Sequence, residues 1–306
     1  MLAPDTFDPP VATVEHLEPG LRRIVAPNPS PMTYRGTNTY LLGTDEVAVI
    51  DPGPDGDVGA RQLDAILNSI GAGQKITHIL ITHSHVDHSP LSRALSRETG
   101  APVYALGDSS TGRSAMMEQL AAVGEIRGGE GIDAQFAPDI LIAAGDVIET
   151  AEWAVRVLPT PGHFCNHISF IWGDAVFTGD HVMGWASSMV SPPDGDLTDF
   201  MASCAALAGV PARIYYPGHG APVSDPKARL DWLVAHRLGR EAEILTALEA
   251  GPATASELAR AIYVDTPPAL LGAAARNVLA HLIDLTGKSM AAPNGPLTAE
   301  TQFRRV

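Results

Sequence analysis

The segment that most constrains the fold is residues 82–88 (THSHVDH), which follows the apolar run at residues 79–81 (ILI). The pattern predicts a buried strand that ends in a loop rich in ligand-type side chains. Those side chains are His83, His85, Asp87 and His88. Imidazole nitrogens and carboxylate oxygens bind zinc, usually three or four to one ion. A solvated polar loop gains nothing from so dense a set, so we interpret the segment as a metal-binding loop.

Four further ligand-type residues lie in turns that follow β-type runs. His163 follows residues 159–162 (PTPG), Asp180 follows 177–179 (FTG), His219 follows 215–218 (YYPG), and Asp51 lies between 49–50 (VI) and 52–53 (PG). Strand ends that lead into turns are where a rigid scaffold holds its functional side chains. Each residue alone is weak evidence, but together they predict one site.

These motifs, taken in order, resemble the metallo-β-lactamase superfamily over about residues 20–225. The resemblance implies an α/β fold, the αββα sandwich, with a metal centre at one edge between two sheets. It also implies the ligand roles. His83, His85 and His163 would hold one zinc ion, Asp87, His88 and His219 would hold a second, and Asp180 would bridge both. Asp51 would orient the histidine loop from behind.

Such a centre is suited to hydrolysis. Two zinc ions about 3.5–4 Å apart can share a hydroxide, because they lower the pKa of bound water to about 7. Five histidines and two aspartates leave coordination positions open, which indicates catalysis rather than a structural clamp. We therefore expect Asp51, Asp87 and Asp180 to serve catalysis, with two Zn²⁺ as cofactors. Mn or Fe would also suit these ligands.

The composition limits the partners. A formal net charge of −15 disfavours a polyanion, because like charges repel phosphate backbones. Residues 1–8 have no basic or apolar signal region, and there is no run of 18 apolar residues, so we expect a cytoplasmic protein without a membrane span. Two cysteines, Cys165 and Cys204, predict reduced thiols.

The apolar pattern predicts most of the secondary structure. After an irregular arm at residues 1–20, strands are expected at 21–25, 39–42, 47–50, 76–82, 147–148, 155–158, 168–172, 175–178 and 214–216, and helices at 59–70, 89–99 and 198–207. For residues 105–140 the sequence pattern predicts only a mixture of helix and loop.

The chain is long enough for a large domain and a small one, and its character changes after residue 225. We expect a catalytic domain at 1–225 and a small domain at 226–306. The second contains a helix at 224–249, a helix capped by Thr254 or Ser256, a helix from 267–268 to about 285 that Gly287 ends, and a hairpin at 293–296. This order predicts a winged-helix module. The small domain carries 9 Lys and Arg and 8 Asp and Glu, so it is nearly neutral. Residues 1–225 carry 11 Lys and Arg and 27 Asp and Glu, so the negative net charge lies in the catalytic domain.

The two-domain layout resembles the beta-lactamase-like protein two family, and the catalytic part is also similar to glyoxalase II. The first resemblance implies single-strand endoribonuclease activity in some members, and the second implies thioester hydrolysis. The candidate recognition helix offers Arg276, Asn277 and His281, with one fixed positive charge, which favours packing or dimerisation over nucleic-acid binding. The loop at 181–189 is rich in Met and Trp and predicts either an apolar wall for an acyl group or ordinary packing. His181 would either contact substrate or support the site from behind.

We therefore expect a di-zinc hydrolase of a small ester, thioester or lactone that uses a metal-bridging hydroxide. A small-molecule substrate is favoured over RNA, and homo-oligomerisation stays open. The main alternative is a metal-dependent single-strand endoribonuclease. A third possibility is a non-enzymatic winged-helix regulator that uses the zinc domain as a sensor, which intact ligands with open positions disfavour. Minor alternatives are promiscuous β-lactam hydrolysis and an iron-bound sulfur dioxygenase.

Overall fold

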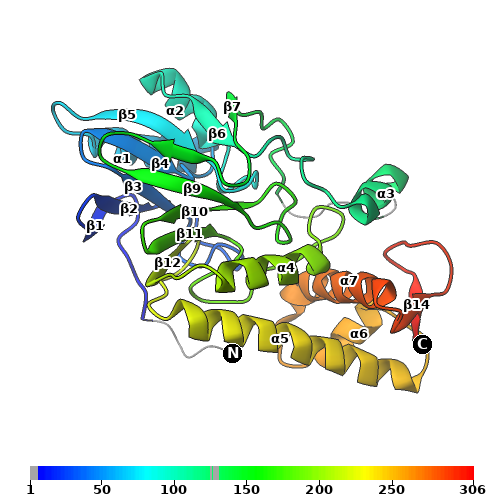
Figure 1. The fold of residues 1–306 in the computed structure, drawn as a ribbon. Helices are drawn as coiled ribbons and strands as arrows, with labels where there is room; N and C mark the ends of the chain where they lie inside the picture. Colours follow the sequence, from blue (N-terminus) through cyan, green and yellow to red (C-terminus); the bar gives the residue numbers. More distant parts are fainter. Residues whose placement is uncertain (1–5, 125, 127–130) are drawn as a thin grey trace.

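The computed structural model describes residues 6–124, 126 and 131–306, and two facing β-sheets form its centre (Figure 1). The first sheet has the strand order β1-β2-β3-β4-β5-β6-β7. Its strands are β1 (Val14–Glu18), β2 (Leu21–Val25), β3 (Asn38–Leu42), β4 (Glu46–Ile50), β5 (Lys75–Leu80), β6 (Val103–Ala105) and β7 (Ile140–Leu141). The pairs from β1 to β4 are antiparallel, and those from β4 to β7 are parallel.

The second sheet has the strand order β12-β11-β10-β9-β8. Its strands are β8 (Val147–Glu149), β9 (Ala154–Pro159), β10 (Ile168–Trp172), β11 (Ala175–Gly179) and β12 (Ile214–Pro217). β11 and β12 run parallel, so their carboxyl ends meet at one edge of the sheet. The other pairs are antiparallel.

Alternate strand residues separate the inner core from the outer layers. Leu42 and Ile50 face a core shared with Phe170 and Phe177 of the second sheet. Their neighbours along the strands, such as Val49, face outward, because successive side chains of a strand point to opposite faces. Strands buried on both faces need nearly continuous apolar sequence, which is what β3 and β4 contain.

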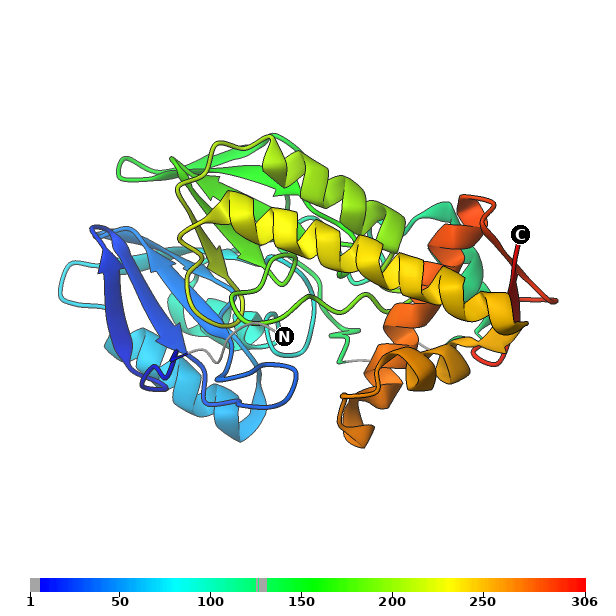
Figure 2. The same cartoon turned by 90° about the horizontal axis from the view of Figure 1, so that it is seen from below.

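Helices cover both outer faces. The first sheet is covered by α1 (Gly56–Asn68) and α2 (Leu91–Thr99), through Ile66 and Leu95. The second is covered by α4 (Leu197–Ala208) and the first half of α5 (Pro226–Ala247), through Phe200 and Leu233. Figure 2 shows α4 and α5 lying side by side on this sheet. The expected αββα sandwich is confirmed.

The C-terminal part forms a small module at the far end of α5 (Figure 2). It consists of η1 (Leu248–Ala250), β13 (Ala253–Thr254), α6 (Ala255–Ile262), η2 (Pro268–Leu270), α7 (Leu271–Gly287), β14 (Ala291–Pro293) and β15 (Gln302–Arg305). Thr254 caps α6, one of the two caps that the sequence predicted, and it forms a reciprocal capping box with Glu257. Helices followed by a β-hairpin give the expected winged-helix arrangement.

One helix from the middle of the chain joins this module. The helix α3 (Ala115–Val123) lies beside it in both views (Figures 1 and 2). Met117 and Leu120 of α3 belong to the same apolar cluster as Leu282 and Phe303. The module therefore completes its core with side chains from the catalytic half.

Two expectations need correction. Residues 14–18 were expected in an irregular arm but form β1, because Val14 and its neighbours pair with β2 at the sheet edge. At 105–140, where helix and loop were expected, the structure has α3 and loops, and β7 begins at residue 140; residues 125 and 127–130 lie outside the described part of the chain. The last long helix begins with a 3₁₀ turn and includes Gly287 rather than ending before it. Residues 1–5 of the expected arm lie outside the described part of the chain, and the domain boundary at 225/226 stays a prediction.

Among the described residues, no helix combines the length and the apolar character that crossing a lipid bilayer requires.

The inner core generates a prediction about stability. Phe170 is fully buried between the sheets, so Phe170→Ala should lower the free energy of unfolding by about 3–5 kcal/mol. Leu141, which is 71% exposed, is the control, and Leu141→Ala should change it by less than about 0.5 kcal/mol. Urea unfolding followed by circular dichroism measures both values. Equal losses in the two variants would show that the sheets do not share this core.

Candidate metal centre

The sequence-predicted ligands meet at one edge of the sandwich because each follows the carboxyl end of a strand. The loop at 82–88 follows β5, Asp51 follows β4, His163 lies beyond β9, Asp180 follows β11, and His219 lies beyond β12. A backbone bridge between Thr37 and His219 joins the two halves at this edge. Residues far apart in the chain are thereby placed in one cluster.

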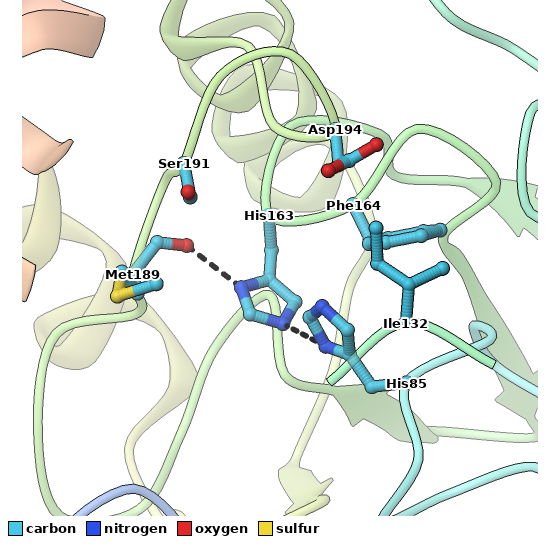
Figure 3. Close-up of a pocket in the computed structure, with 7 residues that line it drawn as sticks. All are labelled: His85, Ile132, His163, Phe164, Met189, Ser191 and Asp194. Atoms are coloured by element: carbon cyan, nitrogen blue, oxygen red, sulfur yellow. Dashed lines mark hydrogen bonds between the residues drawn. The ribbon is translucent and has the colours of Figure 1, made fainter. Parts of the chain in front are cut away.

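His83, His85 and His163 form the first ligand group. His85 Nδ1 lies 2.9 Å from His83 Nε2 and 3.1 Å from His163 Nε2. Figure 3 shows the rings of His85 and His163 facing each other at the site. Three ring nitrogens that point at one another are suited to sharing a cation.

Asp87, His88 and His219 form the second group. His219 Nε2 lies 3.1 Å from Asp87 Oδ2 and 3.4 Å from His88 Nε2. His88 and His219 are fully enclosed, whereas Asp87 is partly exposed. The group therefore has an enclosed side made of imidazoles and an open side at the carboxylate.

Asp180 lies between the two groups. One carboxylate oxygen is 3.2 Å from His219 Nε2 and 3.7 Å from His163 Nε2, and the other is 3.4 Å from His88 Nε2. Oδ1 is buried, and its contact with His88 Nε2 is too long for a good hydrogen bond. A buried carboxylate oxygen with such a weak partner is costly, and a cation would lower that cost. The donor set therefore fits divalent cations.

The outer nitrogens of the histidines are fixed from behind. His163 Nδ1 donates to the carbonyl oxygen of Met189 at 2.7 Å, and His219 Nδ1 donates to that of Gly36 at 3.1 Å. These bonds place the proton on Nδ1 and leave Nε2 free to bind a cation. Figure 3 shows the bond from His163 to Met189.

Asp51 supports the histidine loop, which is the position the sequence predicted for it. Its two carboxylate oxygens accept hydrogen bonds from the backbone N–H of Thr82 at 2.8 Å and from the Thr82 hydroxyl at 2.6 Å. His88 Nδ1 donates to the same carboxylate at 3.0 Å. Asp51 itself has a left-handed backbone with φ of 50°, a conformation that aspartate tolerates better than most residues.

The histidines of the two ligand groups have pKa values shifted in opposite directions. Burial lowers the pKa of His85 to about 3, and it also lowers the pKa of His163. Burial acts in the same direction on His219, but the carboxylates, first of all Asp180, raise its pKa to about 10. Burial likewise opposes the charged form of His88, but the carboxylates, chiefly Asp87, raise its pKa well above the ordinary value. The first group is thus neutral at pH 7, whereas the second binds protons.

A cavity of about 380 Å³ opens above the cluster. Ligand residues form its floor, and apolar side chains form its walls, namely Met32, Val86, Met183 and Met189. Met32 and Val86 are each 43% exposed, so the rim is apolar and accessible. The cavity can hold an apolar group next to the ligand cluster.

The loop at 181–189 has both of the roles that its sequence allowed, cavity wall and ordinary packing. Met183 and Met189 line the cavity, whereas Trp185 stacks on Tyr34 at 4.8 Å between ring centroids. His181 is fully buried and lies 3.5 Å from Cys204 Sγ, so it does not face the cavity. The loop is therefore part wall and part packing.

Sequence reasoning missed several residues that shape the site. Met32 and Val86 line the cavity, but neither is a ligand-type residue that a motif would identify. The carbonyl groups of Gly36 and Met189 belong to the backbone, so no side-chain pattern predicts their role. The buried His167 also supports the site, since its Nε2 accepts a hydrogen bond from the backbone N–H of Asp180 at 3.1 Å. Only its spacing, four residues after His163, could have drawn attention to it.

The separated pKa values generate a prediction about pH. Protons and cations compete for the same Nε2 atoms, and the pKa of His219 lies at about 10. The pKa of His88 is raised as well, so at neutral pH a cation that enters the second group must displace one or two protons, and its affinity should rise about ten- to a hundredfold per pH unit. The first group, whose pKa values are lowered, should bind cations with little pH dependence around pH 7. Chelator competition between about pH 6 and 9 measures both affinities, and equal slopes for the two sites would contradict the assignment.

Comparisons with known proteins agree with this geometry. Residues 32–219 match the metallo-beta-lactamase superfamily, and residues 254–288 match the beta-lactamase associated winged helix domain. An atrochrysone carboxyl ACP thioesterase of Aspergillus fumigatus is 30% identical over 279 residues, which cover 85% of this chain and 78% of that protein. A beta-lactamase-like protein 2 homolog of Drosophila melanogaster is 29% identical and covers 90% of each chain.

Solved structures extend the likeness to the whole chain. A metallo-beta-lactamase family protein from Thermus thermophilus superimposes with a TM-score of 0.77 at 27% identity, over 95% of this chain and 100% of the other. A beta-lactamase domain protein from Burkholderia ambifaria shares the fold, with a TM-score of 0.80 at 20% identity over 98% and 96% of the two chains. The chain therefore belongs to the metallo-beta-lactamase superfamily of hydrolases and carries the associated C-terminal winged helix.

Proposed function

We propose that the protein is a di-zinc hydrolase of small acyl esters, thioesters or lactones, with thioesters first. The observation that carries the proposal is the position of Asp180, whose carboxylate lies between histidines of two candidate ligand groups at the floor of an apolar cavity. His83, His85 and His163 would hold one ion, Asp87, His88 and His219 the other, and Asp180 both. Bound zinc ions would lower the pKa of water and polarise an acyl carbonyl.

The chain's own residues prepare the centre for this chemistry. Burial acts to raise the pKa of Asp180, but the adjacent His219 and His88 hold it well below its ordinary value. Its carboxylate therefore stays ionised and attracts cations at neutral pH. Asp51 keeps the ring of His88 in place from the opposite side. The open side at Asp87 leaves room for water and for the acyl carbonyl.

A cysteine nucleophile does not fit the site. Cys165 and Cys204 are both buried, and burial raises the pKa of each thiol to about 12. Thiols with such pKa values are poor nucleophiles at neutral pH, since the thiolate is the reactive form. Hydrolysis at this cavity therefore depends on activated water.

The cavity walls favour an apolar acyl group. Methionine side chains are flexible and polarisable, so they adapt to acyl groups of different shape. A related protein is named as a carboxyl ACP thioesterase, which agrees with an acyl thioester substrate. A single-stranded RNA substrate fits less well, because the chain carries a net charge of −15.

The direct test is turnover of acyl thioesters by the zinc-loaded protein. Asp180→Asn keeps the size of the side chain but removes the charge, so kcat/KM should fall by on the order of a hundred-fold or more. Leu141→Ala is the matched surface control and should hydrolyse like the wild type. Unchanged turnover by Asp180→Asn would exclude the dinuclear centre.

A single-stranded RNA oligomer should be incubated with the wild type and with the same two variants, Asp180→Asn and Leu141→Ala. Cleavage by the wild type that disappears in Asp180→Asn, without thioester turnover, would replace the acyl proposal with the endoribonuclease alternative. Thioester turnover without RNA cleavage would support the acyl proposal.

Substrate preference gives a second test. Met32 forms part of the accessible rim, so Met32→Ser should lower kcat/KM for long acyl chains more than for acetyl substrates. Each buried methylene contributes about 0.8 kcal/mol, so a preference for octanoyl over acetyl thioester should fall several-fold. A kinetic series over chain length measures this ratio. A parallel loss for all chain lengths would place the acyl group elsewhere.

A further inference from the structure

The carbonyl group that orients His163 belongs to a loop that the C-terminal helices hold. Residues 183–192, here termed the Met loop, carry Met189, whose carbonyl oxygen accepts the hydrogen bond from His163 Nδ1. The loop has no strand or helix of its own. The position of the Met189 carbonyl therefore depends on contacts that its neighbours make.

Both peptide groups next to Met189 are bound by two residues of the C-terminal helices. Arg237 of α5 donates to the carbonyl oxygen of Ser188. The backbone N–H of Val190 donates to Asn277 Oδ1 of α7 at 3.0 Å, and Arg237 Nη1 donates to the same oxygen at 3.0 Å. Arg237 and Asn277 thus hold the chain on either side of Met189 and hold each other.

Two further arginines extend this attachment along the Met loop. Arg229 donates to the carbonyl oxygens of Met183 and Ala186, at 3.0 and 2.6 Å. Arg276 donates to the hydroxyl of Ser191 and the carbonyl oxygen of Pro192, at 2.8 and 2.7 Å. Both ends of the loop are therefore tied to α5 and α7.

Packing alone does not account for Arg237. Its side chain is buried and lies over the ring of Phe200, 4.9 Å from the centroid, and none of the ion pairs among the described residues includes it. Burial without a carboxylate lowers its pKa to about 10. Burying an unpaired guanidinium costs free energy, and an apolar side chain would fill the same space at lower cost. The distinctive property of Arg237 is the fixed pair of bonds that it makes to Ser188 and Asn277.

We propose that Asn277 and Arg237 are positioning residues of the metal centre. They fix the Met189 carbonyl, which fixes the ring orientation of His163 and the proton on its Nδ1. The winged-helix module accordingly helps to position a histidine of the metal centre. Its candidate recognition residues Arg276 and Asn277 bind the Met loop of the catalytic half. The inference rests on cation binding as proposed above.

The same attachment shapes the cavity. Met183 and Met189 lie on the Met loop, and both line the cavity wall. A displaced loop would therefore move the wall and the ring of His163 together. Cation affinity and acyl preference should change in the same variants.

The test compares three variants of α7. Asn277→Leu has a similar size but no acceptor, whereas Asn277→Asp keeps an acceptor for both Val190 and Arg237. Val278→Ala is the matched control, because Val278 is the next residue, is buried and belongs to the apolar cluster of the module core, whereas Val190 of the Met loop belongs to another cluster. Removing a group that orients a metal-binding histidine typically lowers cation affinity about 10–100-fold.

We expect Asn277→Leu to weaken the site of His83, His85 and His163 by that factor in chelator competition. Asn277→Asp should stay close to the wild type, and Val278→Ala should lose stability without losing affinity. Measurements at a temperature where circular dichroism shows all variants folded keep stability separate from affinity. The absorption spectrum of the Co²⁺-loaded protein should change for Asn277→Leu only.

Wild-type affinity in Asn277→Leu, or an equal loss in Val278→Ala, would overturn the positioning role. A wild type that binds no Zn²⁺ would instead refute the proposed di-zinc function, so the two failures are distinguishable.

Discussion

The arrangement of this protein depends on one electrostatic constraint, the convergence of imidazole lone pairs and carboxylates at the largely buried floor of a cavity. Asp180 lies at the centre of this convergence, since it contacts histidines of both ligand groups. Such a cluster is unfavourable unless positive charge enters it. Protons serve the second group at neutral pH, as the raised pKa of His219 shows, but burial keeps them from the first. Cation binding resolves the conflict for both.

The sandwich provides the rigidity that such a cluster needs. Strands from two sheets end at one edge, and short loops carry the ligands directly from those ends. The inner core packs Phe170 and Phe177 directly behind this edge, so the strand ends cannot shift independently. Loops supply the lining of the cavity, and there Met32 and Met183 can adapt without moving the ligands.

The sequence identified the side chains that the structure brings together at this edge, whereas much of what supports them could not be predicted. His83, His163 and Asp180 occur in motifs with fixed spacing, and Thr254 with Glu257 forms a local cap that a short window reveals. The strand β1 escaped prediction because an edge strand needs little apolar pattern. The contact between Asn277 and Val190 could not be foreseen, because it joins positions far apart in the chain and involves backbone groups that every residue has.

The packing of α3 has a consequence for how the chain matures. Met117 and Leu120 are synthesised long before Leu282 and Phe303, with which they share a core. During translation the apolar face of α3 stays without those partners until residues 282 and 303 have been made, so the nascent chain exposes this apolar helix in the meantime. The winged helix consequently cannot be transferred to another catalytic domain by itself, because α3 is needed to complete its core.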